Sequence, residues 1–172
     1  DAFLAPLKKL VVKGISAIAS DKNKVNGILY LPDSNAKKLP LILFIHGGPV
    51  AQDEYSFDMT RQIYAAAGYA VAAVNYRGSS GRGANYTKSI YADWGNKEVK
   101  DIIGITNELI KQGIADSSKL AIAGWSYGGI LTDYTIASDT RFKAAFSGAG
   151  SALQLSMYGT DQYVLQYETE IG

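Results

Sequence analysis

Short apolar runs alternate with longer stretches of mixed polarity along this chain, and their spacing predicts its elements. Residues 11–19 and 25–31 are rich in β-prone residues, and the polar residues 20–24 separate them, which predicts an antiparallel hairpin. Residues 39–45 and 70–75 are apolar at consecutive positions. Such runs are typical of parallel strands that are covered on both faces of a sheet.

Helical patterns are interleaved with these strands. Residues 56–67 have room for one helix, and residues 96–113 carry apolar side chains every three or four positions, which predicts an amphipathic helix. Residues 120–123 and 144–147 are predicted to be two further buried strands, with a helix over residues 127–137 between them. Strands and helices that alternate in this way predict an α/β fold, with an N-terminal antiparallel hairpin leading into a mostly parallel sheet flanked by helices.

The ends of the chain lack such a pattern. Residues 151–172 show no closing element, and the first residue is Asp1 instead of Met. We therefore expect a single incomplete domain over residues 1–172, cut from a longer protein, in which residues 151–172 begin a truncated segment.

Composition and charge narrow the function classes. The 172 residues are 47% hydrophobic with a net charge of +1, as in one globular domain, and this excludes a disordered or fibrous protein. Without a run of like charges, no nucleic-acid partner is expected. Apolar runs such as residues 41–45 are far shorter than the roughly 18 residues of a membrane span, so no membrane partner is expected either. With no cysteine and one histidine, His46, neither a disulfide nor a thiolate or histidine-rich metal site is predicted.

The main candidate for chemistry is the sequence Gly-Trp-Ser-Tyr-Gly-Gly at residues 124–129. It contains a G-x-S-x-G motif between a predicted strand and a predicted helix, which is where a nucleophile elbow occurs. In such a turn the small residues Gly124 and Gly128 let strand and helix approach closely, and the hydroxyl of Ser126 is presented at a helix N-terminus. The alternative is a turn needed only for packing.

A glycine-rich loop, His-Gly-Gly-Pro at residues 46–49, follows the strand 39–45. Loops of this kind supply a backbone N–H to an oxyanion hole. The candidate donors are the backbone N–H groups of Gly48 and Tyr127; a turn without a role is the alternative. His46 precedes Ser126, whereas the base of this architecture follows its serine, so His46 is interpreted as a structural or pocket-wall residue.

The glycine-rich loop at residues 75–83 also follows a strand. It matches neither phosphate-binding motif, and residues 85–87 are not predicted to begin a helix directly after it, so nucleotide binding is a weak alternative. Two interpretations stay open: a loop held by a structural ion pair of Arg77, or a wall of the active site.

Taken together, the motifs resemble the catalytic domain of the prolyl oligopeptidase family of serine peptidases, nearest its dipeptidyl peptidase and acylaminoacyl peptidase branches. The resemblance rests on residues 26–32, 46–49, 75–81 and 124–129, with Asp-Trp-Gly at residues 93–95. It covers roughly residues 25 to 150, in the order that the family shows.

The resemblance implies roles for individual residues. Ser126 would be the nucleophile, with the N–H of Tyr127 and the Gly48 region as oxyanion donors. In relatives a tyrosine hydroxyl can occupy the position that His46 matches, which leaves open whether His46 touches the oxyanion. No metal or organic cofactor is implied.

The family also binds the residue before the scissile bond in an apolar pocket. That pocket would be built partly from residues 151–158, which makes Tyr158, like His46, a candidate pocket-wall residue. The implied substrate is a short peptide.

The chain departs from the family beyond the nucleophile. No histidine follows Ser126, and Asp133, Asp139 and Asp161 come too early to be the family's aspartate. The triad Asp and His are therefore expected to lie outside this chain. Residues 1–10 resemble the strand that leads out of the family's N-terminal β-propeller.

These observations favour a serine peptidase that cleaves short peptides through an acyl-enzyme, with this chain inactive alone. The alternatives are a carboxylesterase of the same fold and a non-catalytic protein that retains the fold. Because a truncated parallel sheet leaves an edge strand unpaired, association with a second copy or with a missing C-terminal portion or partner chain is expected.

Overall fold

A computed structural model describes residues 10–160 and 162–171 of the chain. The expectation of a strand leading out of a propeller concerns residues 1–10 and lies, except for Leu10, outside the described residues. None of the described helices has the length and apolar character that crossing a membrane requires.

The described residues form a mixed sheet with the strand order β1-β2-β4-β3-β5-β6. The strands are β1 (Val11–Ile18), β2 (Lys24–Leu31), β3 (Leu39–Ile45), β4 (Ala70–Asn75), β5 (Ala115–Trp125) and β6 (Phe142–Gly148). Strand β1 pairs antiparallel with β2, and β2 antiparallel with β4, whereas β4, β3, β5 and β6 run parallel. The predicted hairpin and parallel strands, and with them the α/β fold, are confirmed.

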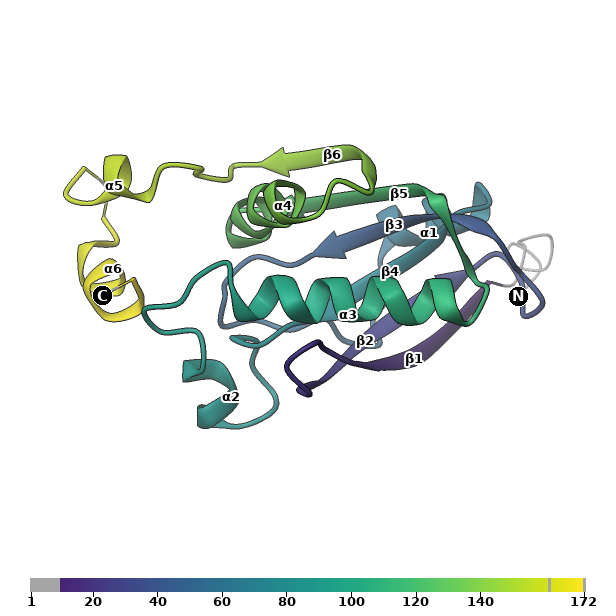
Figure 1. The fold of residues 1–172 in the computed structure, drawn as a ribbon, viewed down its shortest axis with the longest axis horizontal. Coiled ribbons are helices and arrows are strands. Elements are labelled where there is room, and N and C mark those ends of the chain that lie inside the picture. The colour runs from purple at the N-terminus through teal and green to yellow at the C-terminus, as the bar shows by residue number, and fades with distance from the viewer. Residues whose placement is uncertain (1–9, 161, 172) are drawn as a thin grey trace.

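Six helices accompany the sheet in the described part of the chain. They are α1 (Met59–Ala66), α2 (Ala84–Lys88), α3 (Lys97–Lys111), α4 (Tyr127–Ser138), α5 (Gln154–Met157) and α6 (Val164–Glu170). Figure 1 shows α3 and α4 lying along one side of the sheet, and α5 and α6 extending beyond the carboxyl ends of the parallel strands such as β3 and β6.

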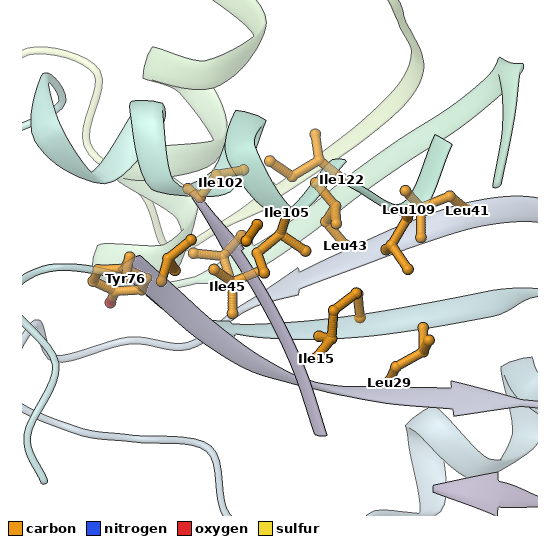
Figure 2. Close-up of a cluster of buried hydrophobic side chains, with 14 of the residues drawn as sticks. Ile15, Leu29, Leu41, Leu43, Ile45, Tyr76, Ile102, Ile105, Leu109 and Ile122 are labelled. Atoms are coloured by element: carbon orange, nitrogen blue, oxygen red, sulfur yellow. The ribbon is translucent and has the colours of Figure 1, made fainter. Parts of the chain in front are cut away.

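The two faces of the sheet are covered unequally. Alternate residues of a strand point to opposite faces, and on one face they form a large apolar core with α3 that includes Leu43, Ile102, Ile105 and Ile122 (Figure 2). On the other face, Ala65 of α1 belongs to a smaller cluster with residues of β2 and β4.

Three expectations about elements were wrong. The strand predicted at residues 144–147 is part of β6, but these four residues are exposed instead of buried, because β6 is the edge strand and α1 packs on β2, β4 and β3 at the other side of the sheet. Helix α2 does begin directly after Gly83. Residues 151–172, for which no element was predicted, contain α5 and α6, which are too short to show a helical periodicity.

Candidate active site

Ser126 stands in a strained turn between the last residue of β5 and the first residue of α4. Its backbone has φ 57° and ψ −123°, a region that L-residues rarely adopt and that costs about 1–3 kcal/mol. Hydrogen bonds hold the turn: Ser126 N donates to Gly148 O at 2.8 Å, and Ser126 O accepts from Gly129 N at 2.8 Å and Ile130 N at 3.1 Å. The side chain of Ser126 is nevertheless exposed. The turn therefore presents the serine hydroxyl to a substrate.

The glycines on either side permit this turn. A Cβ added at Gly124 would lie 2.1 Å from Gly128 O, and one added at Gly128 would lie 2.0 Å from Ile45 O. Both contacts are with backbone atoms, which cannot rotate away. Strand β5, helix α4 and the end of β3 thus meet at distances that only glycine allows.

The loop of residues 46–49 lies against the serine. A Cβ added at Gly47 would be 3.3 Å from Ser126 Cβ and 3.8 Å from Ser126 Oγ. Gly48, Ser126 and Tyr127 line one cavity of about 260 Å³. Because Tyr127 is the first residue of α4, its N–H has no acceptor within the helix and lies at the positive end of the helix dipole. The structure thus brings the three residues predicted to stabilise and attack a carbonyl group to one cavity.

His46 is turned away from the serine. Its Nε2 lies 2.9 Å from Ser79 Oγ, its Nδ1 lies 2.7 Å from Gly47 O, and its ring stacks on Tyr76 at 4.3 Å between centroids. Burial lowers the pKa of His46 and so favours the neutral imidazole. His46 is not among the described residues that line the cavity at Ser126.

The remaining walls of this cavity are largely apolar and aromatic. They come from the loop before α3, from α4 and from the C-terminal segment: Trp94, Ile130, Ala149, Ser151, Met157, Tyr163, Gln166 and Tyr167. The predicted pocket segment, residues 151–158, thus contributes Ser151 and Met157. Tyr158, the predicted wall residue, is 47% exposed and does not line the cavity.

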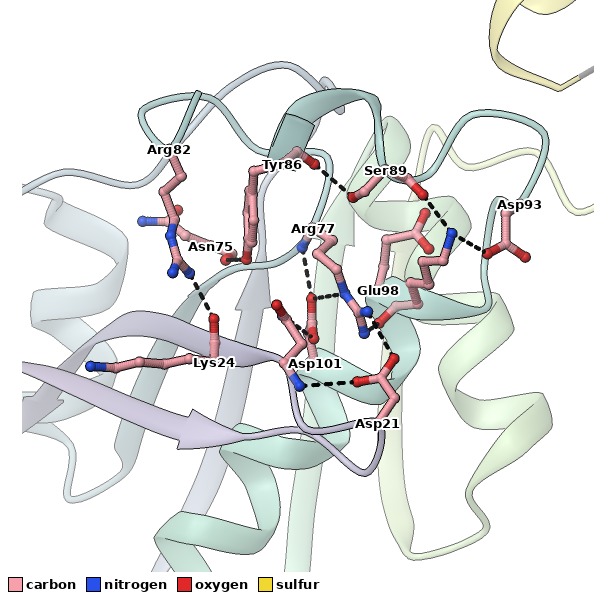
Figure 3. A network of polar contacts seen from close by, with 12 residues as sticks. Asp21, Lys24, Asn75, Arg77, Arg82, Tyr86, Ser89, Asp93, Glu98 and Asp101 are labelled. Atoms are coloured by element: carbon pink, nitrogen blue, oxygen red, sulfur yellow. Dashed lines mark hydrogen bonds and ion pairs between the residues drawn. The ribbon is translucent and has the colours of Figure 1, made fainter. Parts of the chain in front are cut away.

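Arg77 is held in a network of ion pairs and hydrogen bonds with Asp21 and Asp101. Its Nε lies 3.0 Å and its backbone N 2.8 Å from Asp101 Oδ2, and its Nη1 lies 2.8 Å from Asp21 Oδ2 (Figure 3). Burial opposes the charge, but these bonds to Asp21 and Asp101 raise the pKa of Arg77. Of the two interpretations left open, the structure supports the structural ion pair, which fastens the 75–83 loop to α3 and the β1–β2 turn.

Glu98 of α3 is a buried acid that sequence analysis missed. Its side chain is 0% exposed, and its Oε1 accepts a hydrogen bond of 2.5 Å from Tyr127 Oη and one of 3.3 Å from Gly95 N. Burial is the main reason that its pKa is raised to about 7, while the bond from Tyr127 acts in the opposite direction. A signal was available in the sequence: Glu98 has the helical spacing of the buried residues Ile102, Ile105 and Leu109.

Within the described residues, no cluster of three or more histidine, cysteine, aspartate or glutamate side chains could hold a metal ion. The chemistry gathered at the cavity is that of an exposed serine hydroxyl beside backbone N–H donors. Such an arrangement serves acyl transfer, in which the hydroxyl attacks a carbonyl and the donors bind the oxyanion.

Comparison with known proteins identifies the class. Residues 55–171 match the model of the prolyl oligopeptidase family. This chain therefore belongs to the prolyl oligopeptidase family of serine peptidases.

Individual relatives agree with this assignment. The chain is 33% identical over 162 residues to an uncharacterized peptidase of Bacillus subtilis, covering 92% of this chain and 25% of the relative. It is 34% identical over 143 residues to an acylamino-acid-releasing enzyme of Arabidopsis thaliana, covering 83% and 18% of the two chains. Among solved structures, the acylaminoacyl peptidase of Pyrococcus horikoshii superposes with a TM-score of 0.90 at 27% identity, covering 99% of this chain and 28% of the other. The chain thus spans between 18% and 28% of the length of these relatives.

Proposed function

We propose that the protein containing this chain is a serine peptidase that cleaves short peptides through an acyl-enzyme on Ser126. The observation that carries the proposal is the exposed Ser126 in a strained turn, on the same cavity as Gly48 and Tyr127. Relatives named as an acylamino-acid-releasing enzyme, a dipeptidyl aminopeptidase and a dipeptidyl peptidase support a peptide substrate over a simple ester.

In the proposed reaction, the Ser126 hydroxyl gives its proton to a base and its oxygen attacks the carbonyl carbon of the scissile peptide bond. The N–H groups of Tyr127 and Gly48 bind the oxyanion of the tetrahedral intermediate. Its collapse breaks the C–N bond, and the amine leaves with the proton from the base. Water then hydrolyses the ester at Ser126 and regenerates the hydroxyl.

The base comes from polypeptide outside these 172 residues. His46 is the sole histidine of the chain, and its ring bonds to Ser79 and Gly47 instead of Ser126. We therefore propose that the isolated chain has negligible hydrolytic activity.

The cavity walls favour an apolar, preferably aromatic, residue before the scissile bond. The rings of Trp94 and Tyr127 form a T-shaped pair at 4.7 Å between centroids, and Ile130 and Met157 add apolar surface. A solved acylaminoacyl peptidase that superposes on this chain with a TM-score of 0.90 at 28% identity is a complex with Z-Gly-Gly-Phe-chloromethyl ketone.

The test is hydrolysis of matched substrates by the natural polypeptide that contains this chain. The substrates are peptide p-nitroanilides ending in Phe or Asp, and p-nitrophenyl esters. Cleavage of the Phe anilide that is lost in Ser126→Ala, but kept in the neighbouring control Ser147→Ala, supports the proposal. Ester turnover alone would indicate a carboxylesterase, and no turnover of either substrate would indicate a non-catalytic protein.

A further inference from the structure

Helix α3 contacts the nucleophile elbow through one buried acid, and none of the proposed catalytic steps uses that acid. Glu98 lies in the first turn of α3, and Tyr127, which follows Ser126, is the first residue of α4. Their side chains meet in the interior, where Glu98 is 0% and Tyr127 2% exposed. The acid therefore contacts the residue that directly follows the proposed nucleophile.

The side chain of Tyr127 has few ways to move. Its hydroxyl donates to Glu98 Oε1 at 2.5 Å, its ring forms a T-shaped pair with Trp94 at 4.7 Å between centroids, and the ring of Tyr76 lies at 6.1 Å. The hydrogen bond is the one directional contact in this set. Since the ring of Tyr127 is attached to the same Cα as its backbone N, the bond that holds the ring also restrains the position of the backbone N–H.

We propose that Glu98 is a positioning residue for the oxyanion hole: its carboxyl holds Tyr127 so that the backbone N–H of Tyr127 points at the developing oxyanion. This inference rests on the proposed function, because it assigns a role in the chemistry at Ser126. Glu98 itself does not touch the cavity, since it is not among its lining residues.

The strength of the hydrogen bond between Glu98 and Tyr127 depends on whether the carboxyl group of Glu98 is ionised. Glu98 Oε2 is buried and has no hydrogen-bond partner among the described residues. A carboxylate accepts a bond from a phenol about twice as strongly as a neutral carboxyl does, so ionisation tightens the hold on Tyr127. Burial raises the pKa of Glu98 to about 7, which places this change within the working range of most enzymes.

Several other titratable groups lie near Glu98 and Tyr127. Lys97 pairs with Asp93 at 3.0 Å and donates to Ser89 O at 2.6 Å. The titratable groups that act on Glu98 or Tyr127 from neighbouring elements are Asp93 before α3, Tyr76 after β4 and Glu170 in α6. Burial raises the pKa of Tyr76 well above its usual value, so this phenol stays neutral.

The experiment compares labelling of Ser126 by a fluorophosphonate in the natural polypeptide that contains this chain, from pH 5.5 to 9. Glu98→Gln keeps the shape and one acceptor oxygen but cannot ionise, and Glu108→Gln on the same helix is the matched control. We expect the ratio of the wild-type to the Glu98→Gln rate to rise from about 1 at pH 5.5 to about fivefold to tenfold at pH 9. The ratio for Glu108→Gln should stay flat, and taking the ratio cancels the titration of the catalytic base.

Tyr127→Phe provides the second arm. Without the phenol the wild-type advantage over Glu98→Gln should disappear, because the hydrogen bond that carries it is gone. A ratio that is flat with pH in the wild-type background, or that persists in Tyr127→Phe, would overturn the proposal. Thermal unfolding of each variant shows whether a lost rate reflects loss of fold.

A structural readout separates this proposal from the proposed function. In ¹⁵N-tyrosine-labelled protein, the amide signal of Tyr127, assigned by its loss in Tyr127→Phe, should shift with a midpoint near pH 7 and stop doing so in Glu98→Gln. If Ser126 is never labelled but this shift is present, the proposed function fails while the hold of Glu98 on Tyr127 stands. If Ser126 is labelled but the shift is absent, the proposal for Glu98 fails alone.

Discussion

Helix α4 can lie this close to the sheet because residue 128 has no side chain, and replacing Gly128 with alanine tests that claim. The new methyl group would lie 2.0 Å from Ile45 O, 2.8 Å from Ile45 C and 2.9 Å from His46 O. A Cβ normally lies about 3.4 Å or more from other heavy atoms, so α4 and β3 would have to separate by more than about 1 Å. Overpacking usually lowers the free energy of unfolding by about 1–3 kcal/mol, and because the contacts here are with backbone atoms we expect about 3 kcal/mol.

The matched control is Gly104→Ala in α3. Both substitutions place alanine in a helix and gain about 1 kcal/mol of helix propensity. A Cβ at Gly104, however, would lie 3.2 Å from Ala19 Cα, which needs a shift of only a few tenths of an ångström. We therefore expect Gly104→Ala to change stability by less than about 1 kcal/mol.

The assay is hydrogen–deuterium exchange of peptides that cover β5 and α4. The overpacking cost of about 3 kcal/mol less the helix-propensity gain of about 1 kcal/mol leaves a loss of about 2 kcal/mol, which corresponds to exchange faster by roughly thirtyfold in Gly128→Ala. Exchange within about threefold of wild type would show that the backbone contacts at residue 128 do not determine how closely α4 approaches β3.

Four further outcomes follow from the structure. Because burial raises the pKa of Glu98 to about 7, the folded state binds more protons than the unfolded state between about pH 4.5 and 7. The free energy of unfolding should therefore fall by up to roughly 3 kcal/mol as the pH rises through this window. Urea titrations at several pH values should show a smaller fall in Glu98→Gln, and an equal fall would contradict the assignment to Glu98. Ser126→Gly should be more stable than Ser126→Ala by about 1 kcal/mol in thermal unfolding, because glycine tolerates the positive φ of 57°; equal stability would show that the turn stores no strain. The hydrogen bonds of Arg141, and to a lesser degree its charge, lower the pKa of Asp139. Arg141→Gln should therefore raise that pKa in a carbon-NMR titration of the carboxyl group, and an unchanged pKa would contradict the pairing. The isolated chain should self-associate through the edge strand β6, where Phe146 is 60% exposed. Phe146→Lys should therefore lower the mass measured by analytical ultracentrifugation, and an unchanged mass would point to another surface.

The sequence predicts those parts of the fold whose residue pattern matches their surroundings. Strands 39–45 and 70–75 were recognised because they are covered on both faces, and helix α3 because one side of it is apolar. The serine turn was recognised because glycines are required at fixed positions around it, a requirement that the contacts of Gly124 and Gly128 explain.

Features that depend on distant neighbours were not predictable in the same way. The apolar residues of β6 read as a buried strand, but only the strand order places β6 at the edge. Helical spacing places Glu98 on the buried side of α3, but its partner Tyr127 comes from α4 and is identified only when the two helices lie side by side. Likewise, Tyr163 and Gln166 reach the cavity only because α6 and the residues before it lie next to the nucleophile turn.

The most direct test of the central claim is whether Ser126 is an activated nucleophile. The natural polypeptide that contains these residues is incubated with a fluorophosphonate, and its intact mass is measured beside that of Ser126→Ala. If Ser126 is activated, each chain should carry one label, on the peptide that contains Ser126, and Ser126→Ala should carry none. Absence of the label in the wild type, or an equal label in Ser126→Ala, would contradict it.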